Sequence, residues 1–132
     1  MSYDVELCDA ITGDILTLTE PHHMRGGTYA MGGTRFAELN ITYNYSGHFS
    51  RVFNSRESSH ASARDGMLHG IRSLYGLTGA ESIPLIERGI EMLGDDVDDE
   101  DYWRPTEGNA KRALQHCLSL ARMRPDGVWG GD

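Results

Sequence analysis

The sequence predicts an α+β fold, with about three helices packed on one face of a small antiparallel sheet. Apolar and polar residues alternate with the period of a strand over residues 1–54, and apolar residues recur at three- and four-residue spacing from residue 64 onward. The chain has 132 residues, of which 39% are hydrophobic, so it is long enough to bury one core. We therefore expect a single domain over 1–132, strand-rich over 1–54 and helical over 64–124.

Two hairpins are predicted in the strand-rich part. Residues 3–8 alternate between apolar and polar side chains, and the turn signal Thr12-Gly13-Asp14 separates them from the apolar run 15–18. Residues 37–45 give the clearest alternation in the chain. A Ser-Gly turn follows, so we expect residues 48–53 to pair with them as the second hairpin.

The next segment is predicted to be a loop and a first helix. Residues 54–63 are rich in serine and arginine and are expected to form a loop, inserted before the helical part. Apolar side chains recur at helical spacing over 64–75, and Gly76 supplies a helix C-cap. Gly66 and Gly70 weaken this helix.

Two further helices are predicted. Thr78 and Glu81 match a capping box, and the second helix is expected to begin near Ser82, because Pro84 is tolerated only in a first turn. Thr106 is expected to cap the last helix. Pro125-Asp126-Gly127 is expected to end it, and the tail 125–132 follows. The apolar stripe of this last helix consists of Ala110, Ala113, Leu114, Cys117, Leu120 and Ala121.

Charge and composition narrow the set of partners. The 12 basic and 20 acidic side chains give a formal net charge of −8, which repels nucleic acid and anionic lipid and suits a basic protein partner. The first residues do not resemble a leader, and no stretch approaches the ~20 apolar residues of a membrane helix, so we expect a cytoplasmic protein.

The acidic run DDVDDED at 95–101 lacks the turn glycine of a calcium loop and is expected to be a solvated connector. Cys8 and Cys117 are expected to be free thiols.

The residues do not favour an enzyme, a metal centre or a cofactor. The six histidines show no metal-ligand spacing, and the adjacent pair His22 and His23 would point apart on an extended chain. A Ser-His-Asp triad can be assembled across a fold, but the G-x-S-x-G pattern of a nucleophile elbow is absent from the sequence.

The glycine-rich stretch HHMRGGTYAMGG at residues 22–33 is the first candidate binding site. Its glycines allow backbone N–H groups to approach an anionic or planar ligand, its arginine supplies a fork of donors, and its tyrosine supplies a stacking face. The alternatives are a plain structural turn beside an ordinary solvated sheet face. If the stretch folds over the polar face of the second hairpin, the converging residues are Arg25, Gly26, Gly27, Tyr29, Asn44, His48 and Arg51.

The N-terminus of the last helix is the second candidate site. Backbone donors near Thr106, together with Lys111 and the ring of Trp103, could hold an anion. The alternative is an ordinary capped helix with Trp103 in the core.

Several strings of the chain resemble a family of small proteins encoded in phages and prophages. The resemblance covers most of the chain, except that the segment from Asn54 to Leu68 departs from it like an insertion. It implies no catalytic residue, but it does imply an accessory protein that blunts a bacterial defence. The strings are MRGGTYAMGGT (24–34), LNITYNYSGHF (39–49), GIRSLYGLTGAESIPLIE (70–87), TEGNAKRAL (106–114) and ARMRPDGVWGGD (121–132).

Three functions are compatible with these features. The first is a non-enzymatic, oligomeric protein that captures a small anionic ligand, such as a cyclic nucleotide or an ADP-ribose derivative. The second is an acidic inhibitor that binds a host effector protein. The third is a metal- or acid/base-dependent hydrolase using His22, His23 and His48 with nearby carboxylates.

Overall fold

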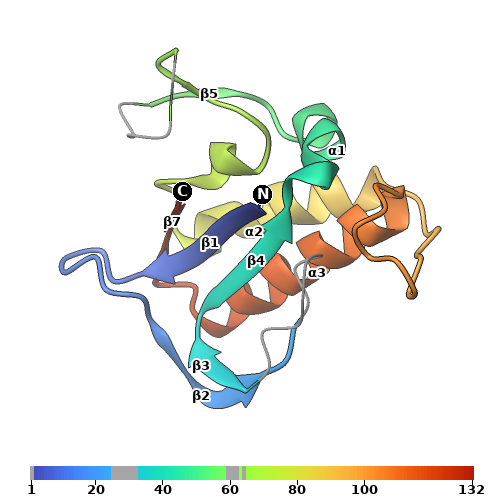
Figure 1. Ribbon diagram of the computed structural model, residues 1–132. Coiled ribbons are helices and arrows are strands. Elements are labelled where there is room, and N and C mark those ends of the chain that lie inside the picture. The colour runs from blue at the N-terminus through green and yellow to red at the C-terminus, as the bar shows by residue number, and fades with distance from the viewer. Residues whose placement is uncertain (1, 25–32, 59–62, 64) are drawn as a thin grey trace.

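A three-stranded antiparallel sheet forms the centre of the fold (Figure 1). The computed structural model describes residues 2–24, 33–58, 63 and 65–132. Strand β1 (Ser2–Cys8) is the middle strand, with β4 (Glu38–Thr42) on one side and β7 (Val128–Gly131) on the other. The first and last described strands are therefore neighbours, and the backbone N–H of Asp4 donates to Oδ1 of Asp132 at 2.8 Å.

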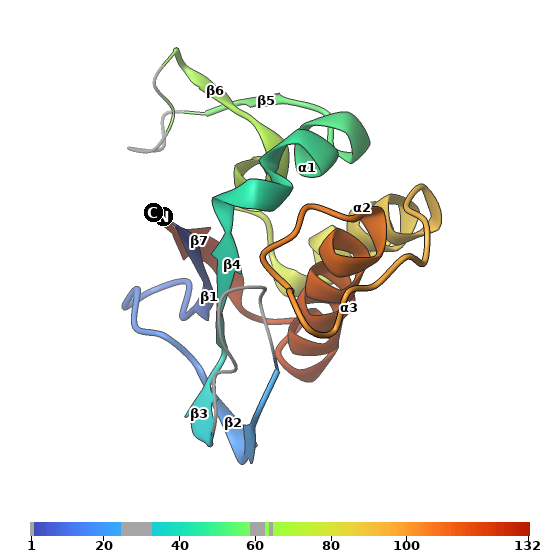
Figure 2. The same ribbon diagram turned by 45° about the vertical axis from the view of Figure 1, so that its right-hand side comes forward.

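The helices lie on one side of this sheet, as Figure 2 shows. Helices α2 (Gly79–Glu91) and α3 (Glu107–Met123) pack against each other there, and the shorter α1 (Ser46–Val52) joins them above. Two small arms extend from the centre: β2 (Thr17–His22) pairs with β3 (Thr34–Phe36), and β5 (Arg56–Glu57) pairs with β6 (Met67–Leu68). This arrangement confirms the predicted α+β class. Among the described residues, no helix is long and apolar enough to cross a membrane.

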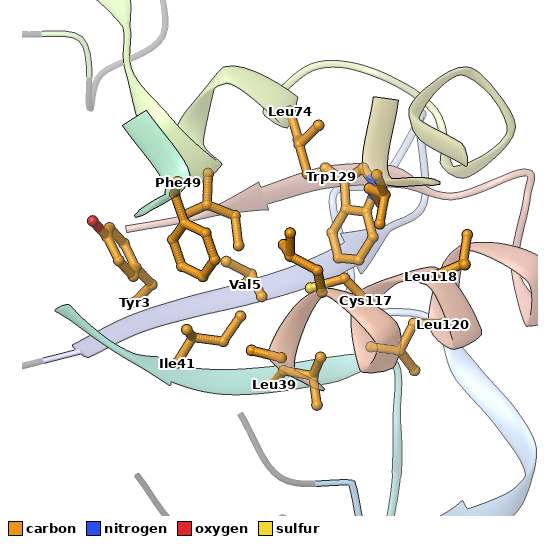
Figure 3. Close-up of a cluster of buried hydrophobic side chains, with 14 of the residues drawn as sticks. Tyr3, Val5, Leu39, Ile41, Phe49, Leu74, Cys117, Leu118, Leu120 and Trp129 are labelled. Atoms are coloured by element: carbon orange, nitrogen blue, oxygen red, sulfur yellow. The ribbon is translucent and has the colours of Figure 1, made fainter. Parts of the chain in front are cut away.

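The core lies between the sheet and α3, as Figure 3 shows. Tyr3 and Val5 point from β1 toward the helices, and Leu39 and Ile41 do so from β4. Leu7 of β1 is also fully buried. All six residues of the stripe predicted for the last helix are buried, so the helical period identified the packed face correctly.

The second predicted hairpin is wrong, because residues 43–52 are helical. Tyr43–Tyr45 form a 3-10 helix, η1, and α1 follows it directly. Strand β4 ends at Thr42, because the side-chain oxygen of Thr42 accepts the backbone N–H of Asn44 at 3.2 Å and turns the chain. Phe49, Val52 and Phe53 are then buried at helical spacing. Strand β4 pairs with β1 instead.

The first predicted hairpin is confirmed only at its turn. Asp9 N–H donates to the carbonyl oxygen of Asp14 at 2.8 Å, and Leu16 N–H donates to that of Leu7 at 2.9 Å. From Thr17 onward the chain leaves β1 and pairs with β3.

The first predicted helix is also wrong. Met67 and Leu68 form β6, and Gly70–Leu74 form a short 3-10 helix, η2, that ends before Tyr75. Gly66 and Gly70 adopt φ of +77° and +58°, a left-handed conformation that interrupts an α-helix.

The remaining helix boundaries follow from their caps. Helix α2 begins at Gly79 rather than near Ser82, since Thr78 and Glu81 complete the capping box and Pro84 is accommodated in the second turn. The predicted tail contains β7.

Candidate functional site

The residues of the first predicted site are placed only in part. Arg25, Gly26, Gly27 and Tyr29 lie outside the described residues. The other three lie on η1 and α1, and each contacts the segment that leads into α3. These contacts join Asn44 Nδ2 to the carbonyl oxygen of Trp103 at 2.8 Å, His48 Nε2 to that of Pro105 at 2.8 Å, and Arg51 Nη2 to Glu107 Oε1 at 3.4 Å.

The residues of the second predicted site lie on the other side of the same contact. Thr106 Oγ1 accepts the backbone N–H of Asn109 at 3.0 Å and caps α3 as predicted. Lys111 Nζ pairs with Asp95 Oδ1 at 2.6 Å. Trp103 is 56% exposed, so the alternative that placed it in the core is wrong. The structure thus brings the three described residues of the first predicted site, Asn44, His48 and Arg51, against the segment that carries the second.

The acidic run at 95–101 is a connector held to α3 by several of its carboxylates. Bonds from the backbone N–H groups of Asp101 and Glu100, and from the Arg104 guanidinium, hold the pKa of Asp98 below its usual range. The run therefore presents less free acidic surface than the sequence implies. Its ion pairs are Asp95 with Lys111 at 2.6 Å, Asp98 with Arg104 at 3.4 Å and Asp99 with Arg112 at 2.6 Å.

A cavity of about 570 Å³ opens beside this connector. Arg112 and His116 line it from α3, where their four-residue spacing places them on one face. His23 lines it from the chain that enters the glycine-rich stretch, and Asp99 lines it from the connector. Three of the four side chains can donate N–H groups, so the lining suits an anion.

His23 is held in a defined tautomer. The backbone N–H of Gly33 donates to His23 Nδ1 at 3.1 Å, so the neutral ring carries its proton on Nε2. The adjacent His22 is buried instead, with Nε2 2.9 Å from the carbonyl oxygen of Phe36. The two neighbouring histidines therefore have different environments, and only His23 lines the cavity.

Arg112 already holds a carboxylate. Its Nη1 lies 2.6 Å from Asp99 Oδ1, and its side chain is 21% exposed while that of Asp99 is 81% exposed. The Arg112 guanidinium is thus fixed against the protein, whereas its anionic partner sits at the solvent side of the cavity. An oxyanion from solution would meet the same donor fork.

A second cavity, of about 580 Å³, lies between β2 and the end of α3. Its cation, Arg124, is engaged by Asp126 at 3.1 and 2.9 Å and by the carbonyl oxygen of Thr17 at 2.8 Å. Because those bonds occupy the guanidinium from two sides, this cavity is the weaker candidate for an anion.

Metal-ligating and thiol side chains do not assemble a further site in the described part of the chain. Across the described part of the chain, no three His, Cys, Asp or Glu side chains gather in a way that could hold a metal ion. Cys8 and Cys117 are free, and burial raises the pKa of the Cys117 thiol to about 12. That thiol is therefore protonated at neutral pH and unsuited to nucleophilic work.

Sequence reasoning identified His23 as a candidate but did not join it to Arg112 and His116. The four-residue spacing of the last two was the available signal. Their approach to His23 depends on how the β2 and β3 arm meets α3, which no local pattern encodes.

Comparison of the chain with protein-family models, with curated proteins and with solved structures finds no match.

Proposed function

We propose that the protein binds a small anionic ligand in the cavity lined by His23, Asp99, Arg112 and His116. The observation that carries this proposal is the guanidinium of Arg112, fixed beside two imidazoles at a cavity of about 570 Å³. The cavity is widely open to solvent, so a ligand there would be held by its charged groups and not by enclosure. Arginine is also the side chain best suited to two-point recognition of carboxylate and phosphate.

Asp99 supports the proposal because its carboxylate occupies the position that a ligand oxyanion would take. A phosphate or carboxylate of the ligand would replace Asp99 on Arg112, and the Nε2–H of His23 would donate a further hydrogen bond. Asp99 would then compete with the ligand for Arg112, so only an anion that binds the guanidinium more strongly than Asp99 does would occupy the site.

The chemical class that we favour is a nucleotide-like ligand carrying one or more phosphates. Its phosphates would pair with the basic lining, and the resemblance to phage proteins makes nucleotide signals of bacterial defence the first compounds to test. Capture of such a signal requires affinity and slow release, not turnover. Sequestration is therefore the proposed role.

The test is ligand binding to the purified protein, measured by isothermal titration calorimetry with inorganic phosphate, ADP, ADP-ribose and cyclic dinucleotides. We expect Arg112→Ala to weaken binding of the best ligand by at least about 10-fold, since a hydrogen bond to a charged group contributes roughly 1.5–3 kcal/mol. Arg122→Ala is the matched control, because Arg122 lies on the same helix and pairs with Glu87 away from the cavity.

Asp99→Asn provides a test in the opposite direction. Removing the competing carboxylate should tighten anion binding several-fold, whereas loss of a purely structural ion pair would leave affinity unchanged or lower it. Absence of binding by every compound, or equal affinity in the wild-type protein and Arg112→Ala, would refute the proposal.

A further inference from the structure

The β5 and β6 arm places a serine, a histidine and an aspartate in one hydrogen-bonded chain. Ser55 immediately precedes β5 and His69 immediately follows β6, so the antiparallel pairing of Arg56 with Leu68 sets them opposite each other. Asp65 lies four residues before His69, across the turn that leads into β6. The arrangement thus follows from the strand register of the arm.

The distances in this chain are those of hydrogen bonds. Ser55 Oγ lies 2.7 Å from His69 Nδ1, and His69 Nε2 lies 3.0 Å from Asp65 Oδ2. Asp65 Oδ1 also accepts the backbone N–H of Met67 at 3.0 Å. The bonds from His69 and Met67 hold the pKa of Asp65 below its usual range, so its carboxylate is ionised at neutral pH.

An ionised Asp65 fixes the roles of the two ring nitrogens of His69. A carboxylate can only accept, so it keeps the imidazole proton on Nε2. The lone pair of Nδ1 is then directed at the hydroxyl of Ser55. This is the relation of nucleophile, base and orienting group that activates serine, with the two ring nitrogens exchanged relative to the serine proteases.

We infer that Ser55 is a nucleophile, with His69 as its general base and Asp65 as a positioning residue, and that the arm hydrolyses carboxylic esters. This activity is separate from the anion-binding cavity. All three side chains are exposed, so a substrate can reach Oγ. The open surface beside Asp65 also carries Glu57, although neither Ser55 nor His69 lines that surface, and these two carboxylates favour the approach of neutral or cationic esters over anionic ones.

The reaction runs in two balanced steps. Ser55 Oγ bonds to the carbonyl carbon while His69 Nδ1 takes the hydroxyl proton; the ester C–O bond then breaks and the leaving oxygen receives that proton. Water next attacks the acyl carbon, Nδ1 accepts a proton from this water, and the acyl–Oγ bond breaks. The carboxylic acid departs, and Nδ1 returns its proton to Oγ.

The first experiment labels the full-length wild-type protein with an uncharged alkyl fluorophosphonate, in which Oγ forms a bond to phosphorus and fluoride leaves. We expect one adduct per chain, located on Ser55 by peptide mass spectrometry. Ser119→Ala is the control variant, because Ser119 lies on α3, where its hydroxyl donates to the carbonyl oxygen of Gln115 at 3.1 Å, and this variant should be labelled at the wild-type rate. Absence of an adduct on Ser55 in the unaltered protein would overturn the inference.

Two measurements separate the roles of His69 and Asp65. The first is the labelling rate at increasing probe concentration, and the second is the rate at which p-nitrophenol is released from p-nitrophenyl acetate. His69→Ala should slow both reactions by at least about 10-fold, because general-base catalysis typically contributes 10²–10⁴-fold. Asp65→Asn should lower the limiting labelling rate without changing the half-saturating probe concentration. Equal rates in His69→Ala and the wild-type protein would refute the assigned base. Arg112→Ala should retain full labelling, which distinguishes this activity from anion binding.

Discussion

Asn109 organises the connector between α2 and α3 from a buried position. It is 1% exposed, its Nδ2 donates to the carbonyl oxygens of Asp101 and Arg104 at 3.2 and 3.0 Å, and its Oδ1 accepts the backbone N–H of Asp98 at 2.9 Å. One side chain therefore satisfies three backbone groups of a loop that has no strand or helix of its own. Asp99, which lines the proposed anion site, lies within that loop.

We expect Asn109→Ala to lower the free energy of unfolding by about 3 kcal/mol, because truncation leaves buried backbone groups without partners. Urea unfolding followed by circular dichroism measures the change. Gln115→Ala, an exposed position on the same helix, should change stability by less than about 0.5 kcal/mol. Equal stability of the two variants would show that the connector is held by its ion pairs instead.

At the scale of the element, caps fix where the two long helices begin. Thr78 Oγ1 accepts the backbone N–H of Glu81 at 3.1 Å, and Glu81 Oε1 accepts that of Thr78 at 3.0 Å. The same bond from Thr78 holds the pKa of Glu81 below its usual range. The first turn of α2 is thereby satisfied from both directions.

Thr78→Ala should lower the free energy of unfolding by about 1 kcal/mol, whereas Thr78→Ser retains the accepting oxygen and should cost less. Chemical denaturation measures both variants, and hydrogen exchange of the amides at residues 79–81 reports the local effect. If those amides exchanged as slowly in Thr78→Ala as in the wild-type protein, the Thr78 cap would not be what protects the first turn of α2.

Which elements the sequence could predict depends on how much of their pattern is local. The last helix was predicted correctly from its long apolar stripe. The strand predicted over residues 37–45 is correct only for Glu38–Thr42, since the same alternation continues into the 3-10 helix at Tyr43–Tyr45. Residues 48–53 are too short for periodicity to separate strand from helix, and burial of Phe49, Val52 and Phe53 decided it. Strand β7 contains two glycines and pairs with β1 across nearly the whole chain, so no local signal announces it.

The candidate site was less predictable than the fold for the same reason. Thr106 and the capping box are encoded within a few residues and were identified. The cavity combines His23, Asp99 and Arg112 from three separate segments, and the Ser55 to His69 contact requires the register of β5 with β6. Such contacts are set by tertiary packing, which sequence periodicity does not specify.

At the scale of the whole molecule, acid should destabilise the fold. Hydrogen bonds and ion pairs lower the pKa values of Asp65, Asp98, Glu107 and Asp126 in the folded state. A depressed carboxyl pKa adds stability above the unfolded value, and this stability is lost as pH falls through the folded value. Glu6 acts in the opposite direction, since burial and the nearby charges of Glu38 and Asp4 raise its pKa.

The carboxyl groups whose pKa is lowered outnumber the one whose pKa is raised. The thermal midpoint should therefore fall as pH is reduced from about 5 toward about 2. Thermal unfolding by circular dichroism over that range measures the slope. The double variant Asp98→Asn, Glu107→Gln should have a shallower slope than the wild-type protein. A midpoint independent of pH would show that these bonds are equally present in the unfolded chain.

The placement of β7 beside β1 has a consequence for the order in which the chain is made. Strand β1 is synthesised before β4, but the other edge of β1 is completed only when Val128–Gly131 leave the ribosome. Until then the middle strand of the finished sheet is an edge strand with exposed backbone donors and acceptors. The strand that ends in the middle of the sheet therefore waits for its second partner until the segment between β4 and β7 has been made, and the time taken to translate that segment is a lower limit on how long its edge stays open.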